Sequence, residues 1–289
     1  MIMLAQYNSA PWNLDRTKAT VKDIYKLWEE TRANKLGENR RSTLKSAYKY
    51  IKTLEHMIYA SLRAYHMRST IDMCDKGYAT KNNIKSLWGH LDDTAIEHEI
   101  ITVKYSDNLE AQASPPSIRQ PFTTEQIKKI WEHADEPWYD VILIYIYSGW
   151  RFNELLQMKK SDVDLEQRIM RGGSKTKNGI NRIVPIHSRI YPLIERRMKD
   201  AGEYLISHKG RKVSASNFRI HWNNIMANIS PGKVPHECRH TFRTLLDNAG
   251  ANQKCMDLLM GHSSGSTGER IYTHKTLEQL RETIELITI

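Results

Sequence analysis

The sequence predicts a mainly α-helical protein of two domains, with a small β-sheet or hairpin in the second domain. Three observations carry this prediction. Apolar residues recur at helical spacing through residues 20–98. The proline-containing stretch 113–121 then interrupts the periodicity and stops helices. Beyond it, helical segments flank the turn-rich region 162–187, which contains short β-type runs.

The first domain is expected over residues 1–112 as a bundle of helices. Residues 1–19 have no clear periodicity, so we expect a poorly ordered lead-in. A helix is predicted to start at Thr20, because Val21, Ile24 and Trp28 then share one apolar face. Further helices are expected over 42–58, 68–76 and 80–98.

A stripe of basic residues follows one side of the expected helix 42–58. Its members are spaced by four, four and three residues, so a helix places them in a row. Such a row can follow a phosphate backbone, although a solvated helix face is the simpler interpretation of the stripe by itself. The stripe consists of Arg41, Lys45, Lys49 and Lys52.

The second domain is expected over residues 122–289, after a linker over 113–121. Thr123 and Gln126 form a capping box that starts its first helix. The segment 138–148 is apolar nearly all round and is expected to be a buried helix. Other helices are predicted to begin at Arg151 and to cover 188–200, 214–227, 239–249 and 252–260, followed by a tail helix within 276–289.

Composition restricts the function. The net charge is +10, from 43 basic and 33 acidic residues, which favours a polyanionic partner. Three scattered cysteines argue against a disulfide framework and for a reducing compartment. No apolar run has membrane-spanning length, and the N-terminus lacks the features of a signal peptide, so an intracellular, soluble protein is expected.

The segment His236–His240 supports two incompatible interpretations. With Glu237 it fits the His-Glu-x-x-His signature of zinc proteases, in which both histidines bind the metal and the glutamate acts as base. The same segment contains His236-x-x-Arg239, which suits the binding of a phosphodiester under attack by a tyrosine. The rest of the chain decides between the two.

Cleavage of a phosphodiester without metal needs a nucleophile, cationic donors for the non-bridging oxygens and an acid for the leaving oxygen. Arginine suits the second task because its planar fork grips phosphate and stays charged. A lysine beside other cations can be the acid. The second domain offers a candidate for each role: Tyr272, Arg151, Arg239, Lys175, His236 and His262.

Each candidate alone has a simpler explanation, but their order along the chain is hard to assign to chance. The boxes are Ser148-Gly149-Trp150-Arg151-Phe152-Asn153-Glu154-Leu155, then Ser174-Lys175-Thr176 with Arg182-Ile183-Val184-Pro185, then His236-Glu237-Cys238-Arg239-His240-Thr241, and finally Leu259-Met260-Gly261-His262 with Ile271-Tyr272-Thr273-His274. In this order the residues resemble the tyrosine recombinases, particularly the integrases of phages and conjugative transposons. The resemblance is strong over residues 120–289 and rests on architecture alone in the helical first domain.

The resemblance implies a site-specific DNA recombinase that integrates or excises a phage or mobile element. Tyr272 would attack the DNA and form a 3′-phosphotyrosyl bond. Arg151 and Arg239 would hold the phosphate, and Lys175 would protonate the leaving 5′ oxygen. The remaining roles are assistance by His236 and His262, and support from Glu154 without contact to the phosphate.

The resemblance also implies the partners and the setting. The helical core-binding domain and the α+β catalytic domain would form a clamp around double-stranded DNA at recombination sites. The protein would be a monomer when free and a homotetramer on DNA, with accessory DNA-bending or directionality proteins as further partners. We expect no cofactor, no metal and no membrane association, and a place in the bacterial cytoplasm, at the nucleoid when DNA is bound.

Some features depart from the family pattern or leave a choice open. Lys177 lies close enough to Lys175 to compete for the acid role and is otherwise expected to bind DNA. Many phage and transposon integrases carry an arm-binding domain before the core-binding domain, for which this chain has no room, so we expect either a removed segment or a naturally shorter enzyme. Leu277, Leu280, Ile284 and Ile287 form an apolar stripe in the tail, which would dock on a neighbouring subunit or on its own domain.

Three other functions fit the sequence less well than a recombinase. The zinc protease leaves Arg151, Lys175 and Tyr272 without a role, and Arg239 would place a cation beside the metal. A DNA-binding protein that has lost catalysis should lack part of the catalytic set. A type IB topoisomerase uses similar chemistry without site specificity, and both the integrase-like boxes and the compact first domain weigh against it.

Overall fold

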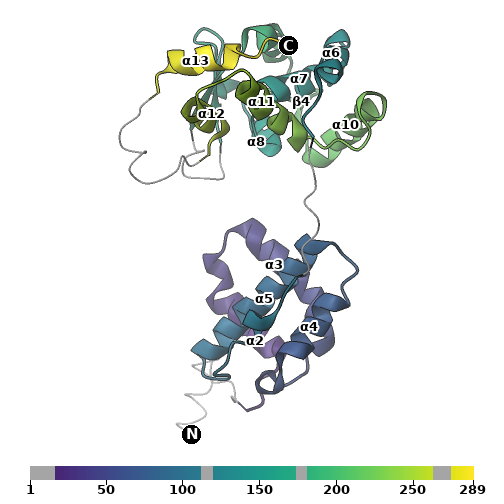
Figure 1. Ribbon diagram of the computed structural model, residues 1–289, viewed down its shortest axis with the longest axis vertical. Coiled ribbons are helices and arrows are strands. Elements are labelled where there is room, and N and C mark those ends of the chain that lie inside the picture. The colour runs from purple at the N-terminus through teal and green to yellow at the C-terminus, as the bar shows by residue number, and fades with distance from the viewer. Residues whose placement is uncertain (1–16, 112–119, 174–180, 263–274) are drawn as a thin grey trace. The chain divides into compact units, whose positions relative to one another are not determined.

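The computed structural model describes residues 17–111, 120–173, 181–262 and 275–289. The chain divides into two compact units, Met1–Ser117 and Ile118–Ile289 (Figure 1). Each unit has its own cluster of buried apolar residues. The boundary between the units lies within the proline-containing stretch in which a linker was predicted. Among the described residues, no helix has both the length and the apolar composition needed to cross a bilayer.

The described part of the N-terminal unit is helical. Helix α5 packs against the other three helices and buries Trp88 and Leu91 against them. The start of α2 confirms the sequence prediction, since Thr20 and Asp23 form a reciprocal capping box and Val21, Ile24 and Trp28 are buried. The helices are α2 (Val21–Thr31), α3 (Glu38–Ile51), α4 (Ala64–Asp72) and α5 (Tyr78–Glu97), with 3₁₀ turns η1 (Ala33–Lys35), η2 (Lys52–Leu54), η3 (Tyr59–Ser61) and η4 (Tyr105–Asn108).

The second helix lies earlier in the chain than predicted. It was expected over 42–58, but α3 begins after Gly37 and ends at Ile51. Beyond Ile51 the chain turns back to the start of α2. The backbone N–H groups of Val21 and Lys22 donate to Met57 and Glu55, which satisfies two helix-terminal donors of α2. Pairing with another segment therefore overrides the helical periodicity of residues 52–58.

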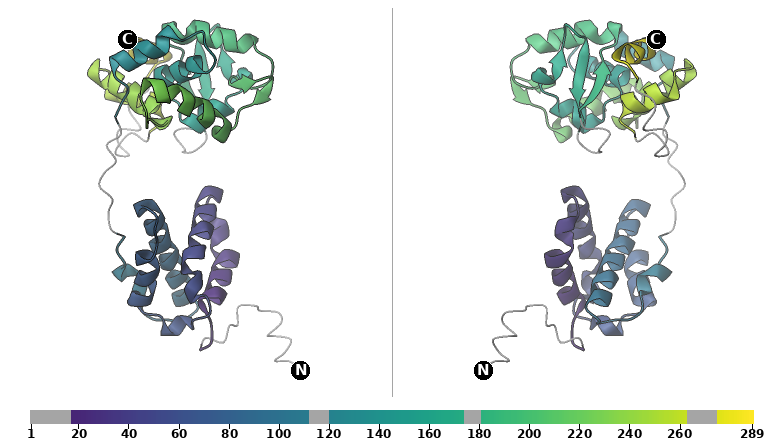
Figure 2. Two further views of the ribbon diagram at one scale, coloured as in Figure 1. Left: turned by 90° about the vertical axis from the view of Figure 1, so that its right-hand side faces the viewer. Right: turned by 90° about the vertical axis from the view of Figure 1, so that its left-hand side faces the viewer.

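The C-terminal unit surrounds the buried helix α7 (Tyr139–Ser148), all of whose residues after Tyr139 are buried. Strands β1 (Val163–Asp164), β2 (Ile169–Gly172) and β3 (Arg182–Pro185) form an antiparallel sheet in the order β1-β2-β3, and Figure 2 shows these strands beside helices of the same unit. The remaining elements are α6 (Thr124–Glu132), α8 (Phe152–Gln157), η5 (Lys160–Asp162), η6 (Ser188–Ile190), α9 (Tyr191–Lys199), β4 (Ser207–His208), β5 (Arg211–Lys212), α10 (Ala215–Ile229), α11 (His236–Asn248), α12 (Gln253–Met260) and α13 (Leu277–Glu285).

Two details of this unit correct the sequence prediction. The β4–β5 hairpin, which turns at Lys209-Gly210 with both residues at positive φ, was not predicted. Helix α11 begins at His236 rather than at Arg239, so His236 and Arg239 both lie within its first turns. The capping box of Thr123 and Gln126 confirms the predicted start of α6.

The tail helix α13 packs on its own C-terminal unit. Leu280, Ile284 and Ile287 are buried against the unit's core, and α13 contacts α12 and β3. Ser188 donates from its backbone N–H and its hydroxyl to the Glu285 carboxylate, at 2.7 Å each. Three of the four residues of the apolar stripe predicted in the tail are thus covered within one chain, and the fourth, Leu277, is half-buried.

Candidate active site

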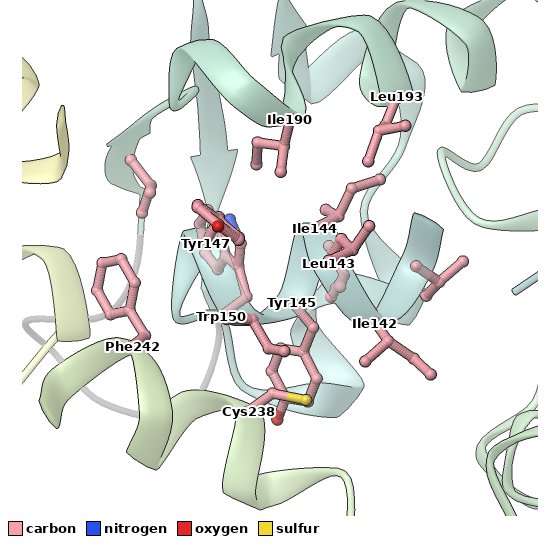
Figure 3. Close-up of a cluster of buried hydrophobic side chains, with 14 of the residues drawn as sticks. Ile142, Leu143, Ile144, Tyr145, Tyr147, Trp150, Ile190, Leu193, Cys238 and Phe242 are labelled. Carbon is pink, nitrogen blue, oxygen red and sulfur yellow. The ribbon is translucent and has the colours of Figure 1, made fainter. Parts of the chain in front are cut away.

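The turn between α7 and α8 places Arg151 and requires a glycine before it. Gly149 has φ +62°, and a Cβ atom at this position would lie 2.2 Å from the Phe242 ring. Figure 3 shows Phe242 and Cys238 of α11 facing the α7 side chains and Trp150. The turn and α11 therefore approach closely only because residue 149 has no side chain.

Replacing Gly149 with alanine is expected to lower the free energy of unfolding by about 2–4 kcal/mol, from the strained backbone and the overlap with the Phe242 ring. Thermal or urea unfolding of the purified variant measures this change. Gly232 is a matched control, because it also has positive φ but has no atom near the added Cβ. Equal losses for Gly149→Ala and Gly232→Ala would contradict the packing explanation.

Arg151 is the N-cap residue of α8 and is bound to the first turn of that helix. Its backbone N–H donates to Glu154 Oε2 at 3.2 Å, and its guanidinium Nη1 donates to Glu154 Oε1 at 2.9 Å. The Arg151 side chain is 21% exposed, whereas that of Glu154 is 3% exposed. The Arg151 guanidinium is therefore partly accessible to solvent, while the buried Glu154 carboxylate holds its orientation.

Helix α11 supplies His236 and Arg239, one turn apart. Glu237 stabilises the helix start, since its Oε2 accepts the Val234 N–H at 2.6 Å at the positive end of the helix dipole. Arg239 is buried, and its Nη1 donates to the Gly149 carbonyl at 2.5 Å. The box around Arg239 is thereby hydrogen-bonded to the glycine of the box around Arg151.

The C-terminal end of α12 joins the arginines. The Met260 carbonyl accepts hydrogen bonds from Arg239 Nη2 and, at 2.8 Å, from Arg182 Nη1. Arg151 Nη2 lies 3.5 Å from the Gly261 carbonyl. Three guanidinium groups thus gather at the negative end of one helix dipole, next to His262.

Arg182 was not predicted as a site residue, although it lies in one of the boxes that carry the resemblance. Its side chain is only 2% exposed. The guanidinium carbon lies 4.0 Å from the centroid of the Trp150 ring, and Nη2 donates to Glu154 Oε2 at 3.0 Å. Arg182 lies in a β-strand, and its carboxylate partner Glu154 lies 28 residues earlier. Neighbouring residues in the sequence therefore gave no sign of this ion pair.

The cluster has an excess of positive charge. Three arginines and one glutamate give a net charge of +2 (three minus one). Burial raises the pKa of Glu154, but Arg182 and Arg151 outweigh burial and hold that pKa below its usual range. Burial and the neighbouring guanidinium charges lower the pKa of Arg239 to about 9, so it stays charged at pH 7. The site can therefore attract a phosphate dianion or diester.

His262 contacts Arg239, with its Nε2 3.1 Å from Arg239 Nη2. Arginine only donates, so Nε2 must accept, and the neutral imidazole carries its proton on Nδ1. Partial burial, then the charges of Arg239 and Arg243, lower the pKa of His262 below its usual value. At neutral pH the ring is therefore uncharged and fits beside the arginines.

The resemblance to tyrosine recombinases implies DNA cleavage at this site. Acidification is expected to slow that reaction once His262 is protonated, because Nε2 can then no longer accept from Arg239. Since the pKa of His262 is lowered, this loss should lie below the ordinary histidine pKa of about 6.5. Single-turnover cleavage rates across pH measure it. In His262→Gln the side-chain oxygen still accepts but does not titrate, so its acid limb should flatten. Identical acid limbs in both proteins would contradict this role for His262.

The remaining predicted residues fall in two groups. Tyr272, Lys175 and Lys177 lie outside the described residues. In the N-terminal unit, the predicted basic stripe lies on the exposed face of α3 and the first residue of η2, as its spacing predicted. Its members Arg41, Lys45, Lys49 and Lys52 are all exposed.

The described residues give Glu237 and His240 roles that a zinc site does not need. Glu237 is bound to the backbone at the start of α11. The His236 and His240 rings meet edge to face, with centroids 4.9 Å apart. Within the described part of the chain, no third histidine, cysteine or carboxylate joins them in a metal-binding arrangement. The phosphate-binding interpretation accounts for Arg239, which the zinc interpretation does not.

Relatives with similar sequences are known. The chain is 32% identical over 190 residues to tyrosine recombinase XerA of Pyrococcus horikoshii, covering 62% of this chain and 65% of that protein. It is 32% identical over 148 residues to tyrosine recombinase XerD of Yersinia pestis, covering 47% of this chain and 48% of that protein. The chain thus spans from about half to about two thirds of the length of these relatives.

Solved structures share the fold. A Tn1549 transposon integrase in complex with transposon right end DNA matches with a TM-score of 0.69 and 23% identity, covering 93% of this chain and all of that chain. A lambda integrase tetramer bound to a Holliday junction matches with a TM-score of 0.73 and 18% identity, covering 91% of this chain and 80% of that chain. The model of the phage integrase family matches residues 89–279. This chain therefore belongs to the phage integrase family, to which the boxes around Arg151 and Arg239 pointed.

Proposed function

We propose that the protein is a site-specific DNA recombinase that cuts and rejoins DNA strands through a 3′-phosphotyrosyl intermediate and so integrates or excises a phage or mobile element. The observation that carries this proposal is the convergence of Arg151, Arg182 and Arg239 with His262 at the end of α12. The cluster holds more positive than negative charge, as the binding of a phosphodiester requires. Membership of the phage integrase family supports the same activity.

The proposed cleavage step needs no external energy source. The Tyr272 hydroxyl oxygen attacks the scissile phosphorus while its proton passes to His236, and the bond from phosphorus to the 5′ oxygen breaks. Lys175 gives a proton to that oxygen, which departs as a 5′ hydroxyl. The phosphodiester is exchanged for a phosphotyrosine ester, so the reverse attack by a 5′ hydroxyl of another strand rejoins DNA without ATP.

The other site residues act on the phosphate or on one another. Arg151 and Arg239 stabilise the charge on the non-bridging oxygens of the transition state. His262 and His236 assist by hydrogen bonding and proton transfer, and Glu154 orients Arg151 without touching the DNA. In this proposal Lys177 binds DNA beside Lys175.

The N-terminal unit is proposed to be the core-binding domain, which uses the exposed basic stripe of α3 to bind the phosphate backbone. Together with the C-terminal catalytic unit it would clamp double-stranded DNA. The related lambda structure is described as a tetramer on a Holliday junction, and we propose a homotetramer for this chain on DNA, with a monomer when free. Accessory DNA-bending or directionality proteins would assist, and the reaction would take place in the bacterial cytoplasm, on the nucleoid.

A nicked duplex carrying the recombination site tests the activity. The nick lets the short strand diffuse away after cleavage and traps the covalent adduct, which is then seen on a denaturing gel. The adduct is expected in the presence of EDTA as well as in its absence, since arginines rather than a metal stabilise the transition state. Loss of the adduct with EDTA, or metal-dependent proteolysis by the protein, would contradict the proposal.

A further inference from the structure

Arg182 lies at the centre of the cluster and yet has almost no access to solvent. It is the first residue of β3, opposite Gly172 of β2. Trp150 packs on both residues. Two of its ring carbons lie 3.4 and 3.5 Å from where a Cβ of residue 172 would be, and the Arg182 guanidinium lies over its ring. With 2% of its side chain exposed, Arg182 is too deeply buried to bind DNA itself.

The hydrogen bonds of Arg182 connect two parts of the site. Nη2 donates to Glu154 Oε2, while the other carboxylate oxygen of Glu154 accepts from Arg151. Nη1 donates to the Met260 carbonyl, which also accepts from Arg239. Each of the two arginines proposed to grip the phosphate therefore shares an acceptor with Arg182.

Arg182 also competes with Arg151 for the negative charge of Glu154, which leaves more of the Arg151 charge for a bound phosphate. Glu154 has one carboxylate for two guanidinium groups, and each oxygen bonds to a different one. Without Arg182, both oxygens could pair with Arg151 in a bidentate ion pair, the preferred geometry of an arginine with a carboxylate. The net charge of the cluster would fall from +2 to +1, and Arg151 would turn away from its exposed edge.

We propose that Arg182 is a positioning residue for DNA cleavage. By binding Glu154 and the end of α12 together, it leaves Arg151 and Arg239 oriented and charged for the scissile phosphate. The proposal rests on the proposed recombinase function, and it adds a residue whose effect depends on the charge of the phosphate.

The test compares Arg182→Met with the wild type on two nicked duplexes in single-turnover cleavage. One carries the normal scissile phosphate, and the other carries an uncharged methylphosphonate there. On the phosphate, Arg182→Met should cleave about 100-fold more slowly, because Arg151 paired fully with Glu154 amounts to one lost charge-stabilising donor. On the methylphosphonate, which lacks the negative charge, the gap between variant and wild type should narrow to less than about 10-fold. A merely structural defect would slow both substrates equally.

Arg197 provides a matched control. It is another buried arginine of the same unit, it pairs with Asp140 through two hydrogen bonds of 2.6 and 2.7 Å, and its guanidinium lies near the Trp138 ring. Arg197→Met loses a buried ion pair outside the site, so any slowing should be the same on both substrates. Thermal unfolding of both variants measures whether their stabilities are comparable.

A second variant keeps the proposal testable if Arg182→Met does not fold. Arg182→Lys retains the charge, but its ammonium does not reproduce the planar fork that spans Glu154 and Met260. It should cleave the phosphate about 10-fold more slowly and regain most of that loss on the methylphosphonate. In addition, Glu154→Gln in the Arg182→Met background removes the carboxylate that would neutralise Arg151, and should restore cleavage about 10-fold.

Three results would overturn the proposal: wild-type cleavage rates in both Arg182 variants, equal losses on both substrates, or no recovery in the double variant. Failure of the recombinase function has a different signature, because the wild type itself would then form no adduct on either substrate.

Discussion

Replacing Tyr272 with phenylalanine is expected to abolish the covalent DNA–protein adduct and to leave DNA binding nearly unchanged. Phenylalanine lacks only the hydroxyl oxygen that would attack the phosphorus, so no bond to the DNA can form. The clamp contacts proposed for α3 and for the arginine cluster remain. A nicked duplex read on a denaturing gel measures the adduct, and a native gel shift measures the affinity.

Tyr191→Phe is the control for this experiment. Tyr191 begins α9 in the same unit, and its ring packs against the Arg168 guanidinium, 5.0 Å from the ring centroid. Because its hydroxyl has no role in the proposed chemistry, the adduct should form at the wild-type rate. An adduct in Tyr272→Phe would show that another residue is the nucleophile.

Replacing Arg239 with alanine should slow cleavage about 10³-fold, at the upper end of the effect of one lost charge-stabilising donor. The same change leaves the Gly149 carbonyl without a donor that it has in the wild type, at a cost of about 1–3 kcal/mol of stability. Arg239→Lys keeps a charge but cannot reach Gly149, Met260 and a phosphate with one planar fork, so it should recover little activity. Single-turnover cleavage and thermal unfolding measure the two effects.

Arg243→Ala separates the loss of Arg239 from a general loss of charge on α11. Arg243 lies one turn further along the same helix and donates to Asp257 Oδ1 at 3.3 Å. Its other guanidinium nitrogen donates to Gln253, so both hydrogen bonds go to α12 side chains rather than to the Gly149 and Met260 carbonyls. Removal of Arg243 should therefore slow cleavage less than about 10-fold. Comparable losses for Arg239→Ala and Arg243→Ala would mean that the helix charge, not the position of Arg239, determines the rate.

The sequence predicted the start of those helices whose first residues cap themselves. The capping boxes at Thr20 and Thr123 each start a helix where expected. Helix α3 was misplaced because residues 52–58 bond to the start of α2, an interaction between distant segments that periodicity does not report. The β4–β5 hairpin was missed because its strands have only two residues each, too short for an alternating pattern.

In the site, too, the sequence revealed residues that lie in recognisable boxes and missed a contact between distant segments. The order of the boxes identified Arg151, Arg239 and His262, which the structure brings together at the end of α12. Tyr272 and Lys175 stay predictions from the sequence. Arg182 was not predicted because its contacts are with Glu154, Trp150 and Met260, which lie in three other elements or turns.

The segment His236-Glu237-Cys238-Arg239-His240 illustrates why a motif needs its surroundings. Glu237 and His240 complete a zinc-protease signature in the sequence. In the fold, Glu237 accepts the Val234 N–H at the start of α11, and Arg239, which lies between Glu237 and His240, donates to the Gly149 and Met260 carbonyls. The glutamate is a helix-start residue, and the arginine is the part of the motif that faces the cluster.

Peptide mapping of the trapped adduct by mass spectrometry tests the phosphotyrosyl intermediate most directly. After nuclease and protease digestion, the peptide that contains Tyr272 should carry the residual nucleotide, linked through its 3′ phosphate, and the released DNA strand should end in a 5′ hydroxyl. A nucleotide on any other residue, or a 5′-phosphate linkage, would contradict the proposed reaction.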